Sequence, residues 1–273
     1  MDSLGFVILT WNSENVIKDC LSSIQNLGNY KITVFIIDNG SEDKTMEIIE
    51  EMQPLFSEDK RLECIALEEN KGTTKSRNIG LKKLSDVDWV CILDSDTQIN
   101  QDAIDGMIGV LKENAQNGIV GPRMLTSEGK IQNSGRRIPT LTEKICKVLP
   151  VSCIQQYAEK LERYEGIEED RLIPVGYLMS ACWVMRSEMI EEIGFLDENI
   201  FYAPEDVEYC IRAWKSGYRV LFDGRVRIIH EWQRLSRKKL ISKHNVEHVK
   251  GLLYLYKKYR FLFRSKKIEK LVT

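Results

Sequence analysis

Two sets of neighbouring carboxylates are the residues best suited to chemistry. Asp94-Ser95-Asp96 follows a short apolar run, and carboxylates at i and i+2 can share a divalent cation such as Mg²⁺ or Mn²⁺. Glu205-Asp206 follows Pro204, at a predicted helix start where the helix dipole favours an ionised carboxylate. One interpretation is a metal site together with a general base. The alternative is that both sets stabilise helix N-termini, since Asp94-Ser95-Asp96 can also cap the helix expected near Gln101.

The elements that must position these residues follow an α/β pattern over the first 125 residues. Short apolar runs alternate with segments whose apolar side chains recur at helical spacing, which is typical of parallel strands joined by crossover helices. The predicted strands span 4–9, 32–37, 62–67, 89–93 and 118–124, and the predicted helices span about 16–27, 46–52, 79–84 and 101–112. We therefore expect an α/β fold with a mostly parallel central sheet flanked by helices.

The rest of the chain is less regular. Residues 126–169 are polar and irregular, with a hairpin turn predicted near 127–129. A long mixed strand is expected over 174–186, and a helix is expected from Pro204 to Gly217. Two short strands over 218–222 and 226–230 precede a basic amphipathic helix over about 240–263. The apolar stripe of the helix after Pro204 consists of Val207, Cys210, Ile211 and Trp214.

Polar residues follow each of the first four predicted strands. In an open α/β sheet, ligands bind beyond the carboxyl ends of the strands, so these residues should meet at one edge. The positions are Thr10, Trp11, Asn12 and Glu14, then Asp38, Asn39 and Ser41, then Asn70, Lys71 and Gly72, and finally Asp94-Ser95-Asp96. An ordinary turn remains an alternative for 38–41, because Asn-Gly favours turns and Ser41 can cap a helix.

The composition of the chain is typical of a globular protein. A chain of 273 residues with 43% hydrophobic content can bury a substantial core. No apolar run is long enough to span a membrane, and no signal peptide is expected. The seven scattered cysteines, without a CxxC pair, indicate buried thiols in a reducing cytosol. We therefore expect a cytoplasmic protein.

The C-terminal segment is strongly basic. Residues 231–273 contain thirteen Lys or Arg and three Asp or Glu, although the whole chain has a net charge of −2. Such asymmetry suggests contact with something anionic, either a diphosphate or the inner face of a membrane. Aromatic residues at helical spacing with leucines favour packing or membrane contact over nucleic acid, so no nucleic-acid partner is expected. The candidate contacts are Arg234, Arg237, Lys238 and Lys239.

The order of the motifs resembles family 2 glycosyltransferases of the GT-A fold. These motifs are LTWNSE, DNGSED, NKGTTKSRNIG, DSDT, GPRM, GFLDE and a late ED followed by His230, and the resemblance covers about residues 4–237. The segments are similar to the bacterial branch that includes rhamnosyltransferases and galactofuranosyltransferases, although rhamnosyltransferases often show Asn-Pro-Asp at the DSD position. Neither GxGxxG nor a Walker P-loop is present, which argues against dehydrogenases and kinases.

The resemblance implies roles for the first half of the chain. Thr10, Asn12 and Glu14 would line the nucleoside pocket, and Asp38 would hydrogen-bond a pyrimidine ring. Gly72 would let the backbone approach the donor, while Lys75 or Arg77 would contact its base or diphosphate. Asp94 and Ser95 would also contact the nucleotide sugar. Asp96, with His230 and Asp94, would hold Mn²⁺ or Mg²⁺, and a structural role remains the alternative for His230.

The resemblance also implies roles for the second half. Asp206, with Glu205 as the alternative, would take the proton from the acceptor hydroxyl. Trp183 and Tyr177 would contact the acceptor, although core packing is an equal alternative for Trp183. His244 and His248 are not expected to bind metal.

The resemblance divides the chain into a donor-binding half, 1–125, an acceptor-binding and catalytic half, 126–237, and the basic tail, 238–273. We expect an inverting, metal-dependent transferase that moves a sugar from a UDP- or dTDP-sugar to a hydroxyl of a saccharide or lipid-linked saccharide. The alternative is a nucleotide-sugar-binding protein without catalytic activity.

Overall fold

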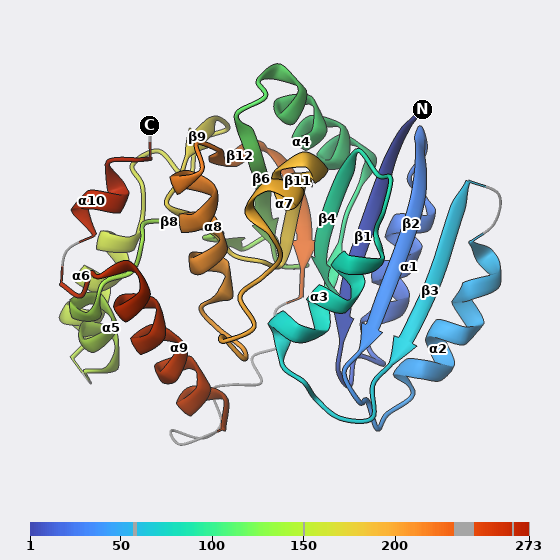
Figure 1. The fold of residues 1–273 in the computed structure, drawn as a ribbon, viewed down its shortest axis with the longest axis horizontal. Helices are drawn as coiled ribbons and strands as arrows, with labels where there is room; N and C mark the ends of the chain where they lie inside the picture. The colour runs from blue at the N-terminus through green and yellow to red at the C-terminus, as the bar shows by residue number, and fades with distance from the viewer. Residues whose placement is uncertain (57–58, 150, 232–242, 264, 273) are drawn as a thin grey trace.

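Four parallel strands form one half of the central sheet in the computed structural model of the chain (Figure 1). Their order is β3, β2, β1, β4, and their carboxyl ends meet at one edge, as predicted. The strands are β1 (Asp2–Thr10), β2 (Tyr30–Asp38), β3 (Lys60–Ala66) and β4 (Trp89–Asp94). The helices between them are α1 (Ile17–Gln25), α2 (Thr45–Met52) and α3 (Thr73–Lys83), with a short η1 (Gln53–Leu55) after α2. The structure describes residues 1–56, 59–149, 151–231, 243–263 and 265–272.

The second half of the sheet is mixed rather than parallel. β11 (Cys182–Arg186) lies antiparallel between β4 and β6 (Asn117–Leu125). β12 (Arg219–His230) runs parallel to β6 and ends beside the two-residue β5 (Thr97–Gln98). The α/β prediction is therefore confirmed, but the antiparallel insertion of β11 was not expected, because strand direction depends on the path of the chain outside the strand.

Residues 126–169 contain more structure than predicted. The hairpin turn is confirmed, because β7 (Ile131–Gln132) pairs antiparallel with β6. The stretch also contains α5 (Leu141–Val148) and α6 (Ser152–Glu162). A capping box between Thr140 and Glu143 opens α5, so the pattern Thr-x-x-Glu was a local sign of this helix. Its short length and polar content obscured the helical periodicity.

The strand predictions for the C-terminal half were wrong in number. The predicted strand 174–186 is three short strands: β9 (Leu172–Pro174), β10 (Tyr177–Leu178) and β11. β10 pairs with β8 (Gly135–Arg136) in a separate two-stranded sheet. The two strands predicted over 218–230 are one strand, β12, whose register with β6 shifts between Asp223 and Arg227. This irregular pairing explains why the hydrophobic pattern of the sequence predicted two strands rather than one.

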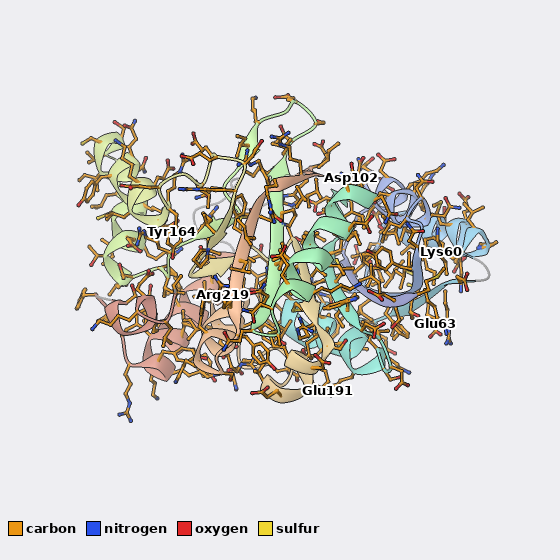
Figure 2. The ribbon with its side chains drawn as sticks, turned by 90° about the horizontal axis from the view of Figure 1, so that it is seen from above. Lys60, Glu63, Asp102, Tyr164, Glu191 and Arg219 are labelled. Carbon is orange, nitrogen blue, oxygen red and sulfur yellow. The ribbon has the colours of Figure 1, made fainter. Side chains whose placement is uncertain are left out.

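Helices cover both faces of the sheet, and two hydrophobic clusters fill the space between. One cluster includes the buried faces of α1, α2 and α4 (Gln101–Glu113), and the other includes those of α7 (Ser187–Ile193) and α8 (Glu205–Lys215). Figure 2 shows side chains along the whole length of the molecule, with Lys60 and Glu63 at one end and Tyr164 toward the other. The predicted stripe of α8 is confirmed, because Val207, Cys210, Ile211 and Trp214 are all buried.

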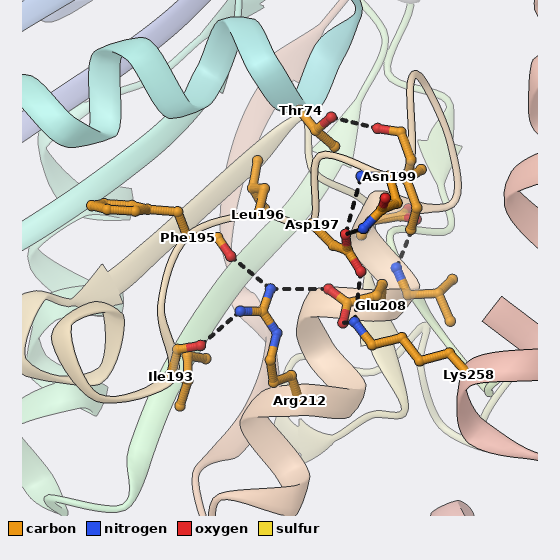
Figure 3. Close-up of polar contacts among 12 residues, drawn as sticks. Thr74, Ile193, Phe195, Leu196, Asp197, Asn199, Glu208, Arg212 and Lys258 are labelled. Carbon is orange, nitrogen blue, oxygen red and sulfur yellow. Dashed lines mark hydrogen bonds and ion pairs between the residues drawn. The ribbon is translucent and has the colours of Figure 1, made fainter. Parts of the chain in front are cut away.

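The C-terminal helix packs against the rest of the protein. α9 (Lys243–Tyr259) buries Leu255 and Tyr256 in the second cluster, and α10 (Lys266–Glu269) follows it. Lys258 Nζ lies 2.6 Å from Asp197 Oδ2 and 2.7 Å from Glu208 Oε1 (Figure 3). One anionic partner of this basic segment is therefore the protein itself.

None of the described helices is both long enough and apolar enough to cross a membrane. All seven cysteines are free thiols, and Cys20, Cys91, Cys182 and Cys210 are buried as predicted. Cys153 is exposed on α6, contrary to the prediction, because that helix lies at the surface.

Candidate active site

A cavity of about 340 Å³ opens at the carboxyl ends of β1 and β4. Its walls come from both halves of the sheet, including the loop before β11 and the N-terminus of α8. The sequence-predicted residues that line it are Thr10, Arg77, Asp94, Ser95, Asp96, Glu205, Asp206 and His230. The fold thus brings the two sets of carboxylates into one cavity, as expected for parallel strands with ligands beyond their carboxyl ends.

Asp94, Asp96 and His230 form a candidate metal site within this cavity. One ligand atom from each side chain lies within 4.8 Å of the others, and His230 Nε2 lies 3.4 Å from Asp96 Oδ1. The pairing of β5 with β12 causes this proximity, because it places His230 opposite Thr97. Two carboxylates and one imidazole fit a divalent cation that keeps other positions for phosphate oxygens.

Gln132 holds the His230 ring from behind. Gln132 Oε1 lies 2.6 Å from His230 Nδ1, and Gln132 Nε2 donates to the His230 carbonyl at 2.8 Å. Because the amide nitrogen of Gln132 donates to the carbonyl, its oxygen faces Nδ1 and favours a proton on that nitrogen, which leaves Nε2 on the side of Asp96. Sequence reasoning missed Gln132, because nothing local in the sequence indicates that β7 lies beside the end of β12.

Arg77 is buried at the centre of the site. Its Nη2 lies 2.5 Å from Asp94 Oδ1 and its Nη1 lies 3.2 Å from Glu205 Oε1. Ser180 supplies further acceptors, with Oγ 2.9 Å from Nη1 and the backbone carbonyl 3.2 Å from Nη2. The predicted contact of Arg77 with the donor's base or diphosphate must therefore compete with protein carboxylates that already occupy the guanidinium.

The environments of Glu205 and Asp206 differ. Burial raises the pKa of Glu205 to about 8, with a further contribution from the charge of Asp206 and an opposing one from Arg77. Burial also raises the pKa of Asp206, whereas the backbone N–H of Val207 and the charges of Lys144 and Arg136 lower it. Two neighbouring carboxyls that interact this strongly favour a state with one proton between them.

Asp206 is also the more accessible of the two. It is half-buried on the cavity wall, whereas Glu205 is buried. Asp206 Oδ1 accepts a hydrogen bond from Val207 N at 2.8 Å. Within the described part of the chain, Asp206 Oδ2 has no hydrogen-bond donor. This oxygen is available to an acceptor hydroxyl.

The predicted nucleoside residues mostly form the turn that supports the cavity. Asp38 Oδ1 accepts from Thr10 Oγ1 at 2.9 Å, and Asp38 Oδ2 accepts from Ser41 N at 2.9 Å. Asp38 is buried and does not line the cavity. Asn12 Oδ1 accepts from the backbone of Glu42, and Glu14 Oε2 accepts from the backbone of Lys44. Asn12, Glu14 and Asp38 thus join the loops after β1 and β2 in this structure.

Gly72 lies against another loop rather than in the cavity. Its φ is +84°, and an added Cβ would come within 2.3 Å of the carbonyl oxygen of Phe201. The close approach allows Thr73 N to donate to that carbonyl at 2.7 Å. Lys75 is exposed on α3 and does not line the cavity either. The close packing against Phe201 therefore explains why this position is a glycine, without any contribution from a bound nucleotide sugar.

The two predicted acceptor residues do not line the cavity. Trp183 is fully buried, stacks on Tyr209 and donates from Nε1 to the carbonyl of Leu178 at 3.3 Å. Its ring face is therefore not open to a sugar, because β11 lies in the centre of the sheet. Tyr177 is also buried, and burial raises the pKa of its hydroxyl.

Several cavity residues were not predicted. They come from segments whose place depends on tertiary structure: Ser13, Thr73, Met179, Ser180 and Tyr202. Ser13 and Thr73 follow β1 and open α3, so the rule that polar residues after strands line a site could have found them. Met179, Ser180 and Tyr202 lie in loops with no local pattern. Arg234, Arg237, Lys238 and Lys239 lie outside the described residues.

Comparison with known proteins identifies relatives over most of the chain. The model of the family described as Glycosyl transferase family 2 matches residues 6–194. N-acetylglucosaminyl-diphospho-decaprenol L-rhamnosyltransferase of Mycobacterium tuberculosis (strain CDC 1551 / Oshkosh) is 23% identical over 240 residues, which cover 84% of this chain and 76% of that protein. Poly-beta-1,6-N-acetyl-D-glucosamine synthase of Staphylococcus epidermidis is 34% identical over 254 residues, which cover 88% of this chain and 59% of that protein.

Solved structures show the same fold. The crystal structure of GalNAc-T7 with UDP, GalNAc and Mn²⁺ superposes with a TM-score of 0.70 at 15% sequence identity. The match covers 94% of this chain and 48% of that one. The likeness extends over nearly the whole sheet and its helices.

Proposed function

The chain belongs to glycosyltransferase family 2 and has the α/β fold predicted for it, and we propose that it transfers a sugar from a nucleoside-diphosphate donor to a hydroxyl acceptor with inversion. The observation that carries this proposal is the single cavity shared by the Asp94–Asp96–His230 cluster and Asp206. A transferase needs both: a charged site for the donor's diphosphate and a base for the acceptor. The family membership supports a role in glycan biosynthesis.

The protein's residues divide the chemistry between them. Asp206 Oδ2 accepts the proton of the acceptor hydroxyl, and the hydroxyl oxygen attacks the anomeric carbon of the donor. The bond from that carbon to the phosphate oxygen breaks, and its electron pair leaves with the nucleoside diphosphate. Asp96 and His230, with Asp94, would hold Mn²⁺ or Mg²⁺, which would neutralise the diphosphate. The guanidinium of Arg77 on Asp94 favours Asp96 as the more direct ligand.

The identity of the donor and acceptor is proposed from the chemistry of the relatives. The fold neighbour GalNAc-T7 was solved with UDP and Mn²⁺, which supports a UDP-sugar here, with a dTDP-sugar as the other pyrimidine candidate. The mycobacterial relative's name describes a lipid-linked diphosphate acceptor, which supports a saccharide or lipid-linked saccharide acceptor. We also propose that residues 1–125 bind the donor and that 126–237 bind the acceptor and supply the base.

A thermal-shift panel tests the proposal. Full-length protein is heated with UDP-, dTDP- and GDP-sugars, each with and without Mn²⁺, and slow hydrolysis of each sugar nucleotide is followed by release of the free sugar. We expect one pyrimidine donor to raise the Tm in a Mn²⁺-dependent way, and Asp96→Ala to abolish that shift. A protein that binds no sugar nucleotide would disprove the proposal.

The alternative is a nucleotide-sugar-binding protein without catalytic activity. The Glu205-Asp206 pair argues against it, because placing a buried carboxyl beside a half-buried one is unfavourable and a binding module has no use for a base. Metal-dependent hydrolysis of the donor would support the enzyme. Donor binding with no hydrolysis and no transfer to any saccharide would support the alternative.

The tail also has a proposed partner, an anionic membrane surface. Val246, Val249 and Leu253 are exposed on α9 at helical spacing, and Lys250 and Lys257 are exposed beside them. An apolar stripe flanked by lysines suits the surface of an anionic bilayer. Cosedimentation with phosphatidylglycerol vesicles at low salt should exceed that with phosphatidylcholine vesicles, and binding to oligonucleotides instead would contradict it.

A further inference from the structure

Three cationic side chains surround a buried carboxylate next to the candidate base. Arg136 on β8 and Lys144 and Lys147 on α5 all approach Glu162, the last residue of α6. Lys147 Nζ lies 2.5 Å from Glu162 Oε2, whereas Lys144 Nζ lies 3.7 Å from Oε1 and Arg136 Nη1 lies 3.7 Å from Oε2. Lys147 is thus hydrogen-bonded to Glu162, but Lys144 and Arg136 are too far away for a direct hydrogen bond.

This cationic cluster adjoins the cavity through Met179. Arg136 Nη2 contacts Met179 Sδ at 3.4 Å, and Met179 lines the cavity together with Asp206. The charges of Lys144 and Arg136 also act on Asp206, where they lower the pKa of its carboxyl. The cluster is therefore near the base, and its residues are separate from the Asp94–Asp96–His230 set that would face the donor's diphosphate.

The cationic side chains are only partly paired. Glu162 and the half-buried Glu143, whose charge acts on Lys144, supply two negative charges against the three positive ones, and Asp206 brings the total to zero. Of the three cations, only Lys147 is hydrogen-bonded to one of these carboxylates among the described residues. His248 adds no charge at neutral pH, because burial and the neighbouring Lys144 lower its pKa to about 4. A half-buried ammonium group without a hydrogen-bonded anion, such as that of Lys144, is unfavourable, since burial removes the solvation of the ion.

Lys144 has the most unused hydrogen-bonding capacity. Its ammonium group carries three donors, yet among the described residues no acceptor lies within hydrogen-bonding distance of it. Its side chain is only 23% exposed, so bulk water does not fully solvate it, and burial lowers its pKa. Arg136 is held in place by Asn133 O, which accepts from its Nε at 2.9 Å.

We propose that Lys144, backed by Arg136, binds a phosphate group carried by the acceptor. The inference rests on the proposed transferase function and names a substrate class for it: a saccharide linked to phosphate or diphosphate, rather than a neutral sugar. A phosphate offers several strong acceptor oxygens to lysine and arginine donors. Bound there, it would fix the acceptor with its hydroxyl toward Asp206.

Matched sugar probes test the proposal by calorimetry. Full-length protein saturated with UDP and Mn²⁺ is titrated with N-acetylglucosamine 1-phosphate and with methyl N-acetylglucosaminide, so that the nucleotide blocks the donor's diphosphate site. We expect the phosphorylated sugar to bind at least about 10-fold more tightly, which is about 1.4 kcal/mol. Lys144→Gln should remove this preference, and Lys144→Arg should keep much of it. Lys160→Gln, which changes an exposed lysine of α6, is the matched control and should keep it fully.

Two results would overturn the proposal: equal binding of both probes by the unaltered protein, or an undiminished preference in Lys144→Gln. The Tm of each variant without probe verifies that it is folded. A second titration without nucleotide and metal, in an Asp96→Ala background, tests the cation site where donor binding is removed. If this background keeps a phosphate preference that depends on Lys144, while the unaltered protein binds no sugar nucleotide, the cation site is retained and the transferase function is rejected.

Discussion

Arg77 Nη2 lies 2.5 Å from Asp94 Oδ1 in the interior of the cavity wall. The same guanidinium reaches Glu205 at 3.2 Å, so one side chain from α3 connects the end of β4 to the start of α8. The side chains of Arg77 and Glu205 are 3% and 7% exposed. Arg77 is therefore a structural link between the proposed donor and acceptor sides as well as a residue of the cavity.

Removing this link should strongly destabilise the fold. Arg77→Met leaves Asp94 without its cation and Glu205 without a hydrogen-bond donor, and breaking a buried ion pair on one side typically costs about 3–5 kcal/mol. The free energy of unfolding in urea measures the effect. Arg61→Met is the control, because Arg61 pairs with Glu63 while 71% exposed and should change stability by less than about 1 kcal/mol. Equal losses in the two variants would show that Arg77 does not hold the site together.

Asp206→Asn should stop turnover without preventing donor binding. The amide cannot take the acceptor proton, so we expect kcat to fall by about 100-fold or more, while the thermal shift with donor and Mn²⁺ stays. Glu205→Gln is the matched variant. It keeps an oxygen for Arg77 and Ser180 and should lose far less activity. The reverse ranking in a transfer or donor-hydrolysis assay would identify Glu205 as the base.

Gln132→Ala should weaken metal binding although Gln132 is not itself a proposed ligand. Without the contact to Nδ1, the His230 ring loses its fixed orientation and tautomer, and loss of such a partner typically reduces metal affinity about 10–100-fold. Mn²⁺ titration of the UDP-bound protein measures this change. Gln156→Ala, at an exposed position of α6, should have no effect. Unchanged Mn²⁺ affinity in Gln132→Ala would mean that His230 is not a ligand or needs no support.

Glu205 should make stability fall as pH rises. Its pKa is about 8 in the folded protein against an ordinary value of 4.5, so between these values the folded state holds a proton that the unfolded state has released. By linkage, the free energy of unfolding then decreases with increasing pH across this window. Glu205→Gln lacks the titration, so its Tm relative to the unaltered protein should increase from pH 5 to pH 8.

Glu188→Gln provides the comparison for this pH series, since the Glu188 side chain is 75% exposed. Its Tm difference should stay constant with pH. A constant difference for Glu205→Gln as well would contradict the raised pKa of Glu205.

Gly72→Ala should be more destabilising than an ordinary glycine substitution. Its φ of +84° disfavours any side chain, and the new Cβ would meet the carbonyl of Phe201, so we expect a loss of about 1–3 kcal/mol or more. Gly109→Ala is the control, because nothing lies within 4 Å of a Cβ there and α4 should gain about 0.5–1 kcal/mol. A small effect at Gly72, measured by denaturation, would return it to a donor-contact role.

The sequence predicted the features that depend on local patterns. The parallel strands β1 to β4 and the buried stripe of α8 were predicted because hydrophobic periodicity is read within one element. Helix α3 was placed too late, at Ile79 rather than Thr73, because Arg77 and its neighbours are buried polar residues that obscure the apolar pattern. The polar residues after each strand located the edge of the sheet where the cavity lies.

The roles of individual residues at that edge of the sheet could not be predicted from local patterns. Asn12, Glu14 and Asp38 follow strands as expected. Their side-chain oxygens, however, accept hydrogen bonds from backbone N–H groups of the loop after β2. Trp183 has the right residue type for stacking on a sugar, but it is fully buried and stacks on Tyr209 instead. Burial and partners, which decide such roles, depend on segments far away in the chain.

By itself, the sequence determined that this protein is an α/β member of its glycosyltransferase family with acidic residues at the carboxyl ends of its strands. These properties follow from residue types and short spacings. The tertiary structure alone decided that His230 lies beside Asp96 with Gln132 behind it, that Arg77 is shared by Asp94 and Glu205, and that cations from β8 and α5 gather next to Asp206. Each of these relationships requires strand pairing or helix packing between distant segments, and the pairing partner of a strand is not encoded in its own local pattern.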